Sequence, residues 1–374
     1  MKKLSRISKL SSKIAVMAIL SMSILAASCN SKKKAASVKY TLNLARSVSE
    51  TAGNPLILIS KANNFYADNG LELQFTGVER AGATEAVSIG KMDGQYLYLV
   101  PPLAEGGQGA NITILAGSVS GGKAVLARKE VVDKLRNVND WKGARIGLKL
   151  YAIPDMIIKS ALSEDYGFDL EKDVEFKYYD GDESTVAALQ KGLIDVGTTS
   201  SSYVEVAKSL GVEYLFPLTK LKPNYVCCRQ SVNTKRLEED REAFKILVKG
   251  EILAYKTYET DEKLAVSIFS SAIGQTEEWT YDYLYNTKTN QEINFNPDPN
   301  YNGTLGVYTI LQNSGYIENG RPLNEFFNIE LYAEVLKEVI AENPNDPFYK
   351  DMWSFFVKNN NKYPNFSSTY SSTI

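Results

Sequence analysis

The 374-residue sequence contains no histidine and only three cysteines, Cys29, Cys227 and Cys228. Histidine is the commonest general base and metal ligand near neutral pH. Its absence excludes a Ser-His-Asp triad, a Cys-His dyad and a histidine-based zinc site. The chain also lacks a GxxxxGK[ST] phosphate loop, and its short glycine clusters indicate no more than turns. We therefore predict a protein that is not an enzyme and has no cofactor and no bound metal, although Asp and Glu could still hold a hard cation.

Long apolar runs are also lacking. The longest largely apolar stretch, Ile14–Ala27, has 14 residues and is too short to span a bilayer of about 30 Å as a helix. It follows a basic segment without acidic residues and ends in the small residues Ala26, Ala27 and Ser28. This is the layout of a secretory signal peptide.

Cys29 directly follows those small residues. The segment resembles a bacterial lipoprotein signal, which implies cleavage after residue 28 and lipidation of Cys29. Leu25 lies one place further from the cysteine than in the strict pattern, so an ordinary cleaved signal is the alternative. Residues 29–37, NSKKKAAS included, are polar and read as a flexible tether. We expect an extracytoplasmic protein, anchored by lipid to the periplasmic or cell-surface face of a membrane.

The mature chain is acidic. Removing the five basic residues of the signal from the 42 basic and 44 acidic residues leaves a net charge of −7. Nucleic-acid binding needs a basic surface, so a nucleic-acid partner is excluded. A mature chain of about 345 residues exceeds one hydrophobic core, which predicts two domains. We expect a monomer.

One pattern occurs twice along the chain. In the first copy, LELQF (71–75) alternates like a strand, Ala83 to Gly90 has helical spacing, Asp93 follows, and YLYLV (96–100) and ITILAG (112–117) are further predicted strands. Pro101 and Pro102 should end the strand at 96–100.

The second copy has the same order. VEFKYY (174–179) is a predicted strand, STVAALQKG (184–192) a helix, and Asp195 precedes the short strand VGTT. A run of serines, the helix 203–211 and the strand 212–217 complete it. Strands that alternate with helices at this spacing imply mostly parallel sheets with right-handed crossovers. The sequence predicts two similar α/β domains, and the alternative is a chance likeness between two helix exits.

The order of these segments resembles the substrate-binding proteins of ABC importers, in the group that binds nitrate, sulfonates, taurine and thiamine-pyrimidine precursors. The resemblance rests on LILISKANNFYADNGLELQF, VPPLAEGGQGANITILAG, SGGKAVLARKE, DWKGARIGL, YAIPDMIIKSAL, AALQKGLIDVG and NSGYIENGRPLNEFFN. It implies the type II periplasmic-binding fold, an α/β fold of two lobes in which each lobe is a mostly parallel sheet flanked by helices. It also implies two crossing strands as hinge, a small-molecule ligand between the lobes, and an ABC permease with its ATPase as partners.

The resemblance also sets expected boundaries. The crossing strands should be 124–128 and 225–229, so lobe one is 38–127 plus 226–374 and lobe two is 128–225. A strong helix is expected in FKILVKGEILAYKTY. The tail beyond Glu342 departs from the family pattern and has no functional interpretation.

Candidate ligand contacts come from loops at the carboxyl ends of predicted strands, where open α/β sheets bind ligands. Glycines there allow close approach of backbone amides. Pro154 fits the first position of a helix, which puts Ile153 at the N-cap and leaves unpaired amides at that end. The candidates are Arg46, Ser47, Asn54, Tyr98, Pro101, Ser118, Ser120, Gly121, Gly122, Tyr151, Ala152, Asp155, Ser200, Ser201 and Tyr203. Each group also has an alternative interpretation. The arginine could be a solvated loop charge, the glycines could form only a turn, and the tyrosines could pack in the core. These groups predict a small polar or anionic solute with an organic body.

Two further details are open at this level. Ser202 and Glu205 fit a capping box at the start of a helix. Cys227 and Cys228 are neighbours in a predicted strand, so their side chains should face opposite sides, with one thiol buried and the other near the surface, while a strained vicinal disulfide is the alternative. Two other functional classes also fit: an enzyme on the same fold, and a surface lipoprotein acting as sensor, adhesin or scaffold. Thiamine-precursor synthases of this fold imply a histidine consumed as substrate, which this chain lacks.

Overall fold

The computed structural model describes residues 37–47, 54–78, 82–150, 152–285 and 293–370, and residues 38–374 form one compact unit. The predicted signal peptide, Cys29, most of the tether and Tyr151 lie outside the described residues. In the described ranges, no helix is both long and apolar enough to cross a membrane.

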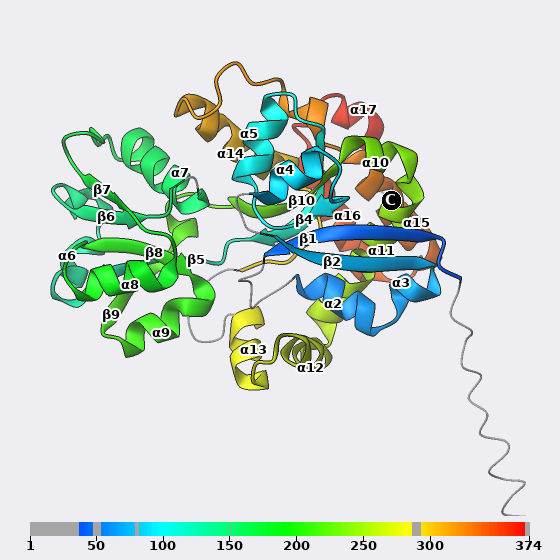
Figure 1. The fold of residues 1–374 in the computed structure, drawn as a ribbon, viewed down its shortest axis with the longest axis horizontal. Coiled ribbons are helices and arrows are strands. Elements are labelled where there is room, and N and C mark those ends of the chain that lie inside the picture. Colours follow the sequence, from blue (N-terminus) through cyan, green and yellow to red (C-terminus); the bar gives the residue numbers. More distant parts are fainter. Residues whose placement is uncertain (1–36, 48–53, 79–81, 151, 286–292, 371–374) are drawn as a thin grey trace, which may run out of the picture. The chain divides into compact units, whose positions relative to one another are not determined.

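The compact unit contains two five-stranded sheets (Figure 1). The first has the order β2-β1-β3-β10-β4. Strand β1 pairs in parallel with β2 and β3, and β10 is antiparallel to β3 and β4, so four strands run in one direction. The strands are β1 (Tyr40–Ser47), β2 (Leu71–Val78), β3 (Gly94–Gln95), β4 (Ile112–Ser120) and β10 (Val226–Asn233).

The second sheet has the order β7-β6-β8-β5-β9 and repeats this arrangement. Strand β6 is parallel to β7 and β8, and β5 is antiparallel to β8 and β9. The strands are β5 (Lys123–Arg128), β6 (Arg145–Leu148), β7 (Glu175–Tyr178), β8 (Val196–Ser200) and β9 (Val212–Pro217). In both sheets a single strand, β10 in the first and β5 in the second, runs against four parallel ones.

The helices between the strands also correspond. Helices α2 (Pro55–Ala62), α4 (Ala83–Ser88) and α5 (Val100–Gly107) follow β1, β2 and β3, and the short helix α3 (Phe65–Asp68) extends α2. Helices α7 (Ile153–Ser160), α8 (Asp182–Gln190) and α9 (Val204–Ser209) follow β6, β7 and β8. The prediction of two similar α/β halves with mostly parallel sheets is confirmed.

Strands β5, β6 and β8 of the second sheet are buried on both faces, which explains their nearly continuous runs of apolar and small residues. Along β5, Ala124 and Leu126 contact one cluster, which α8 and α9 complete through Leu189 and Ala207. Val125 belongs to the opposite cluster, the main core. Successive strand residues point to opposite faces, so this alternation places an apolar layer on each side of the sheet.

Two expectations were wrong in detail. Residues 96–100 are not a strand, because β3 ends at Gln95 and α5 begins at Val100. Pro101 and Pro102 therefore lie in the first turn of a helix, where the missing N–H of proline costs no hydrogen bond. In addition, β5 belongs to the second sheet. The chain thus leaves the first sheet at Gly121 and Gly122, before the expected crossing strand rather than after it.

In the described residues after β10, the regular secondary structure is mainly helical. The predicted helix is confirmed as the long α11, whose buried residues recur at helical spacing. The helices are α10 (Thr234–Glu239), α11 (Arg241–Thr260), α12 (Glu262–Ile273), α13 (Glu277–Tyr285), α14 (Tyr301–Asn313), α15 (Glu330–Glu342), α16 (Pro347–Asn360) and α17 (Phe366–Tyr370), and the short helix α6 (Val132–Leu135) precedes β6.

The C-terminal tail is part of the core. The rings of Trp353, Phe366 and Tyr370 surround Phe356 with centroid distances of 5.1, 5.6 and 5.6 Å. Asn360, which is fully buried, donates to Asp298 at 3.0 Å and accepts from the backbone of Tyr301 at 2.8 Å. The tail therefore fixes the segment before α14.

The repeated Gly-x-x-Asp motif has the same backbone role in both sheets. The backbone N–H of Asn43 in β1 donates to Asp93 Oδ2 at 2.7 Å, and that of Arg145 in β6 donates to Asp195 Oδ2 at 3.0 Å. Each aspartate N–H returns a bond to the carbonyl of the same strand residue, at 2.9 and 2.8 Å. Each motif therefore joins a helix exit to the neighbouring parallel strand.

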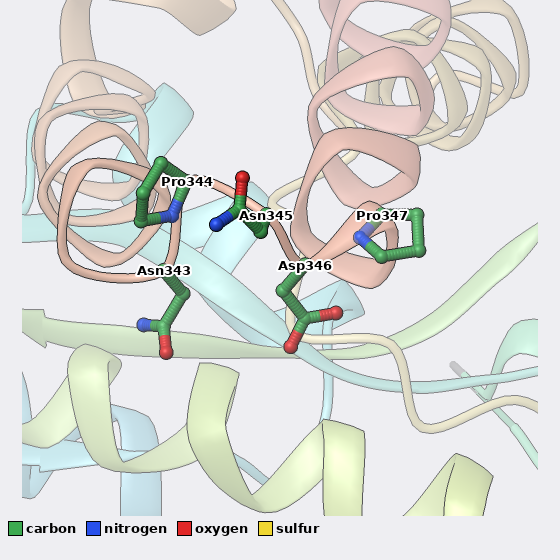
Figure 2. A pocket seen from close by; sticks show the side chains of 5 residues that line it. All are labelled: Asn343, Pro344, Asn345, Asp346 and Pro347. Carbon is green, nitrogen blue, oxygen red and sulfur yellow. The ribbon is translucent and has the colours of Figure 1, made fainter.

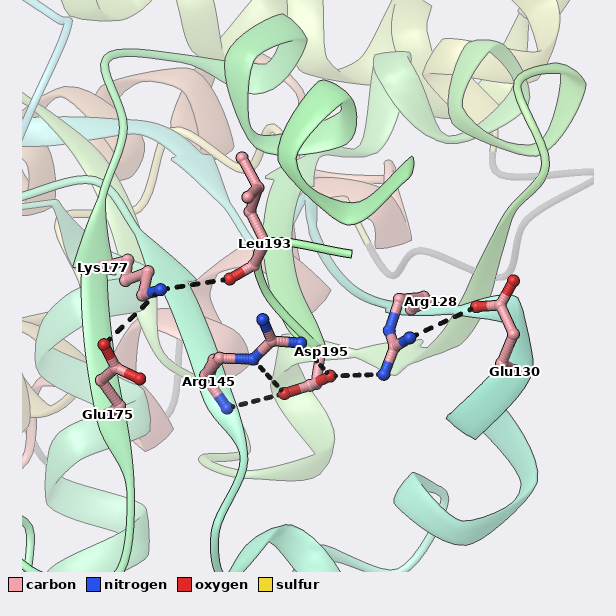
Figure 3. A network of polar contacts seen from close by, with 7 residues as sticks. All are labelled: Arg128, Glu130, Arg145, Glu175, Lys177, Leu193 and Asp195. Carbon is pink, nitrogen blue, oxygen red and sulfur yellow. Dashed lines mark hydrogen bonds and ion pairs between the residues drawn. The ribbon is translucent and has the colours of Figure 1, made fainter. Parts of the chain in front are cut away.

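Each aspartate also binds an arginine near the antiparallel strand. Arg236, in the helix after β10, donates to Asp93 at 3.0 Å, and Arg128, at the end of β5, donates to Asp195 at 2.8 Å. Figure 3 shows the second of these networks, with Arg145 on the other side of the carboxylate. Both aspartates directly precede a parallel strand, so they lie at the edge opposite the carboxyl ends of the strands. They are structural, and they are not part of the predicted ligand edge.

Candidate ligand-binding site

The candidate site lies where the chain passes from the first sheet to the second. Ser120 ends β4 and exchanges two backbone hydrogen bonds with Asn294, at 2.8 and 2.9 Å. Gly121 and Gly122 follow with φ of 66° and 72°, a conformation that disfavours side chains. The carbonyl of Gly122 accepts from the backbone N–H of Ser201 at 3.0 Å. The chain turn between the sheets is thus tied to the carboxyl end of β8.

A lysine and a carboxylate meet at the same place. Lys123 Nζ donates to Ser200 Oγ at 3.0 Å, and the backbone N–H of Ser200 donates to Asp182 Oδ2 at 3.1 Å. Burial is the largest cause of the raised pKa of Tyr203, and the nearby charges of Glu183 and Asp182 raise it further. The second sheet therefore ends in one cation, two carboxylates and several hydroxyl groups.

The serines of β4 are engaged with the protein itself. Ser118 is buried and its hydroxyl donates to the carbonyl of Tyr96 at 3.1 Å. Ser120 Oγ accepts from the guanidinium of Arg229 at 3.1 Å. Arg229 is 2% exposed, and burial lowers its pKa to about 10. In this structure both hydroxyls hold the strand ends in place.

Five other candidates lie at the carboxyl ends of the first sheet. Arg46 is exposed and Ser47 ends β1. Tyr98 packs with Ala45, the neighbour of Arg46, in a small apolar cluster. Asn54 caps α2 by accepting from the N–H of Leu56 at 2.9 Å, while its Nδ2 is buried and makes no hydrogen bond in the structure. Pro101 is half-buried in the first turn of α5.

The start of α7 differs from the prediction by one residue. Ala152, rather than Ile153, precedes the first turn, and no side chain caps this end. Asp155 is fully buried and forms an ion pair with Lys159 at 2.7 Å, one turn further along the helix. That pairing assigns Asp155 a structural role in this conformation. The predicted capping box at Ser202 does not form, because α9 begins at Val204 without a side-chain cap.

The described contacts join Ser120, Gly122, Ser200 and Ser201 at one place. Among the contacts of the described residues, none joins this group directly to Arg46. Sequence reasoning missed Lys123, Asp182 and Asn294. Lys123 and Asp182 had a signal, since Lys123 follows the Gly-Gly pair and Asp182 lies between a predicted strand and a predicted helix. Asn294 had none, because its partner lies more than 170 residues earlier in the chain, at Ser120.

The site offers an ammonium group, hydroxyl groups, carboxylates and backbone amides, which can form hydrogen bonds and ion pairs with a polar solute. Within the described ranges, no group of three or more His, Cys, Asp or Glu residues could hold a metal ion.

A separate surface hollow of about 500 Å³ lies between α15 and α16 (Figure 2). It is lined by Asn343, Pro344, Asn345, Asp346 and Pro347. Asp346 caps α16 through the N–H of Phe348 and pairs with Lys256. The polar side chains in this turn therefore complete helix ends, and the hollow contains none of the predicted contacts.

The two matched sheets and their crossing define a periplasmic-binding-protein fold, and solved structures share it. The ligand-binding component of an ABC-type import system from Staphylococcus aureus, with zinc bound, has a TM-score of 0.65 at 15% identity, covering 79% of this chain and 99% of that one. The aliphatic sulphonate binding protein SsuA from Escherichia coli has a TM-score of 0.60 at 13% identity, covering 75% and 89%. The predicted fold class is confirmed.

The same fold also includes an enzyme. The desulfurization enzyme DszB has a TM-score of 0.59 at 14% identity, covering 80% of this chain and 100% of that one. No curated protein matches the sequence. The NMT1/THI5-like family profile matches residues 55–256, more than half of the chain. The chain belongs to this family.

Proposed function

We propose that the protein is an extracytoplasmic solute-binding protein that captures a small polar or anionic organic solute and delivers it to an ABC importer. The observation that carries this proposal is the crossing between the two sheets, where Lys123, Ser200, Ser201 and Asn294 converge on the glycine turn. The similar solved structures from S. aureus and E. coli, whose printed names describe an import component and a sulphonate binder, support it.

In this proposal the two sheets are the cores of two lobes, and the solute lies between them. Lobe one contains residues 38–120 and 226–374, and lobe two contains residues 123–225, which assigns β5 to the sheet it pairs with. Ligand shifts such a protein toward a closed state only through its differential affinity for that state. Hinge closure around a ligand is a known motion of periplasmic binding proteins.

The test is a thermal-shift panel on protein that has been stripped of ligand by unfolding and refolding. The panel contains alkanesulfonates, taurine, nitrate, pyrimidines, amino acids and divalent cations. A ligand at a hundred times its dissociation constant should stabilise the folded state by about 2.7 kcal/mol. We expect an anionic organic compound to respond. A response to divalent cations alone would contradict the proposed ligand class.

A matched pair of variants tests the site. Lys123→Met removes the cation that touches Ser200, so affinity for an anionic ligand should fall about tenfold. The control is Lys91→Met, an exposed lysine in the Gly-x-x-Asp turn at the opposite edge. Equal affinities of the two variants would place the ligand elsewhere.

The anchor and the lack of catalysis belong to the same proposal. If Cys29 is lipidated, Cys29→Ser should release the protein from the membrane or leave it misprocessed, because the variant cannot carry the lipid that anchors it. The solute should be recovered chemically unchanged after incubation with the protein. The protein itself should be a monomer in solution. A stoichiometric or catalytic product would favour an enzyme, as the similarity to DszB allows.

A further inference from the structure

Cys227 and Cys228 lie in β10, just after the chain returns from the second sheet. The register of β10 against β4 shifts between Val226 and Cys228 and again between Cys228 and Arg229. In a regular strand, neighbouring side chains face opposite sides, whereas an irregularity of this kind redirects them. The two Sγ atoms are consequently 3.5 Å apart. One thiol is buried and the other is partly exposed, as expected, but the two side chains do not face opposite sides of the strand.

The two sulfurs are thiols in this structure, and they differ in exposure. Cys227 is buried, and Cys228 is partly exposed. A small-molecule reagent can therefore reach the second sulfur first. The first sulfur is held next to it and cannot turn away without disturbing the core.

A buried cation lies beside the pair. Arg229 donates from Nη1 to the carbonyl of Cys228 at 2.7 Å, and its guanidinium interacts electrostatically with both cysteine side chains. The thiolate is the nucleophile in disulfide exchange, and a neighbouring cation favours it. Proximity, partial access and a neighbouring cation each favour reaction of the two thiols.

We propose that Cys227 and Cys228 form a redox-modification site that closes to a vicinal disulfide by exchange with a low-molecular-weight disulfide. The Cys228 thiolate attacks one sulfur of the reagent, which forms a mixed disulfide and releases one thiolate. The Cys227 thiolate then attacks the Cys228 sulfur, which forms the bond between the two cysteines and releases the second thiolate. Two protein thiols are oxidised, the reagent is reduced to two thiols, and these take up the two protons that the protein loses.

The bond should be easy to reopen. Adjacent Cα atoms are about 3.8 Å apart, whereas disulfides usually join Cα atoms about 4.4 to 6.8 Å apart, and deviation makes the bond more reducible. The sulfurs must also approach from 3.5 Å to about 2.05 Å. Closure therefore moves the irregular part of β10 that carries Arg229, and Arg229 links this strand to Ser120 and to the carbonyl of Pro299.

The experiment uses the full chain with Cys29→Ser, so that only the vicinal pair can react. The reduced protein is incubated with oxidised glutathione, quenched with acid, and analysed by intact mass and by thiol titration after unfolding. We expect a product that has lost two hydrogen atoms and both titratable thiols, without added glutathione. Reduced glutathione should restore the starting mass. Hydrogen exchange of the peptide that contains 223–233 should change between the two forms.

Single variants separate the two steps. Cys227→Ser should stop at the mixed disulfide and retain glutathione on Cys228, while Cys228→Ser should react much more slowly. Three results would overturn the proposal: two titratable thiols that persist in excess reagent, a glutathione adduct that persists when both cysteines are present, or a bond formed between two chains. None of these readouts depends on the ligand, so they do not test the proposed transport function.

Discussion

The aspartates of the two Gly-x-x-Asp motifs occupy the same place in the two sheets but are held differently. Each lies 50 residues after the strand residue whose N–H it accepts, Asn43 for Asp93 and Arg145 for Asp195. In the first sheet the side chain of Asn43 accepts from Thr76, in β2, at 2.9 Å. In the second sheet the guanidinium of Arg145 turns to the aspartate, with contacts of 2.9 and 2.8 Å.

The difference shows that the backbone contacts of the motif are common to both halves, while the side-chain charges are not. Asp195 has two arginine partners, and hydrogen bonds from Arg145 and Arg128 lower its pKa to about 2 although partial burial opposes them. A carboxylate whose pKa is lowered in the folded state stabilises that state while it is ionised. We therefore expect the second-sheet motif to contribute more to stability than the first-sheet motif.

The largest effect is expected for Asp195→Ala. The substitution leaves two guanidinium groups and the N–H of Arg145 without their acceptor, so the free energy of unfolding at pH 7 should fall by about 3 kcal/mol. Chemical denaturation measures it, with Asp133→Ala, whose side chain is 97% exposed, as the control. Because the pKa of Asp195 is lowered to about 2, its contribution should be lost as the pH falls from about 4 to about 2. A constant difference between wild type and variant across that range would contradict the charge argument.

The second prediction contrasts Asp195 with Asp298, a buried aspartate on the first-sheet side whose pKa is raised rather than lowered. Burial raises the pKa of Asp298 to about 7, although Asn360, the N–H of Asn300 and, more weakly, Arg229 oppose this. An unfolded aspartate ionises near pH 4, whereas the folded one keeps its proton until about pH 7. Unfolding therefore releases a proton in this range, and stability should fall by about 2 kcal/mol between pH 5 and pH 7.

Asp298→Asn tests this slope. The variant should be flatter than wild type between pH 5 and pH 7, as measured by urea unfolding at several pH values. Asp351→Asn, on the exposed face of α16, should keep the wild-type slope. If Asp298→Asn and Asp351→Asn gave the same pH dependence, Asp298 would be ionised in the folded protein at pH 5.

The third prediction completes the direct comparison. Asp93→Ala removes one charged contact with Arg236 and one backbone acceptor, and both lie in a partly exposed position. The free energy of unfolding should fall by about 1.5 kcal/mol, roughly half of the loss in Asp195→Ala. Equal losses would mean that the backbone bonds, which the two motifs share, carry the whole effect.

The sequence predicted the parts of the fold that depend on local pattern. The helix exits at Gly90 and Gly192 and the strand after Gly192 were recovered, because a positive-φ glycine ends a helix in a recognisable way. The prediction of a strand at 96–100 was wrong because YLYLV is a continuous apolar run, which periodicity alone cannot assign to a strand or to another buried segment. The proline pair that was expected to end the strand lies in the first turn of α5.

The contacts that make the site depend on distant pairs. Ser120 meets Asn294, and Lys123 meets Ser200. No local pattern indicates which serine faces solvent and which binds an arginine, as Ser120 does through Arg229. Strand order decides these contacts. In the first sheet, β10 pairs with β3 and β4 although all five strands of the second sheet lie between β4 and β10 in the sequence.

The smallest effect is expected from converting one motif into the other. Arg145→Asn gives the second sheet the residue found in the first, and removes one of the two arginines that bind Asp195. The N–H of residue 145 still donates to the aspartate, and Arg128 still pairs with it. Arg145 is about a third exposed, so the loss should be only about 0.5 kcal/mol, and it should shrink in high salt because screening weakens exposed pairs. The reverse change, Asn43→Arg, should give no gain, since Thr76 loses its acceptor and Arg236 already binds Asp93. Urea unfolding at low and high salt measures both variants. A loss in Arg145→Asn as large as that in Asp195→Ala would show that Arg145, rather than the aspartate, organises the second-sheet motif.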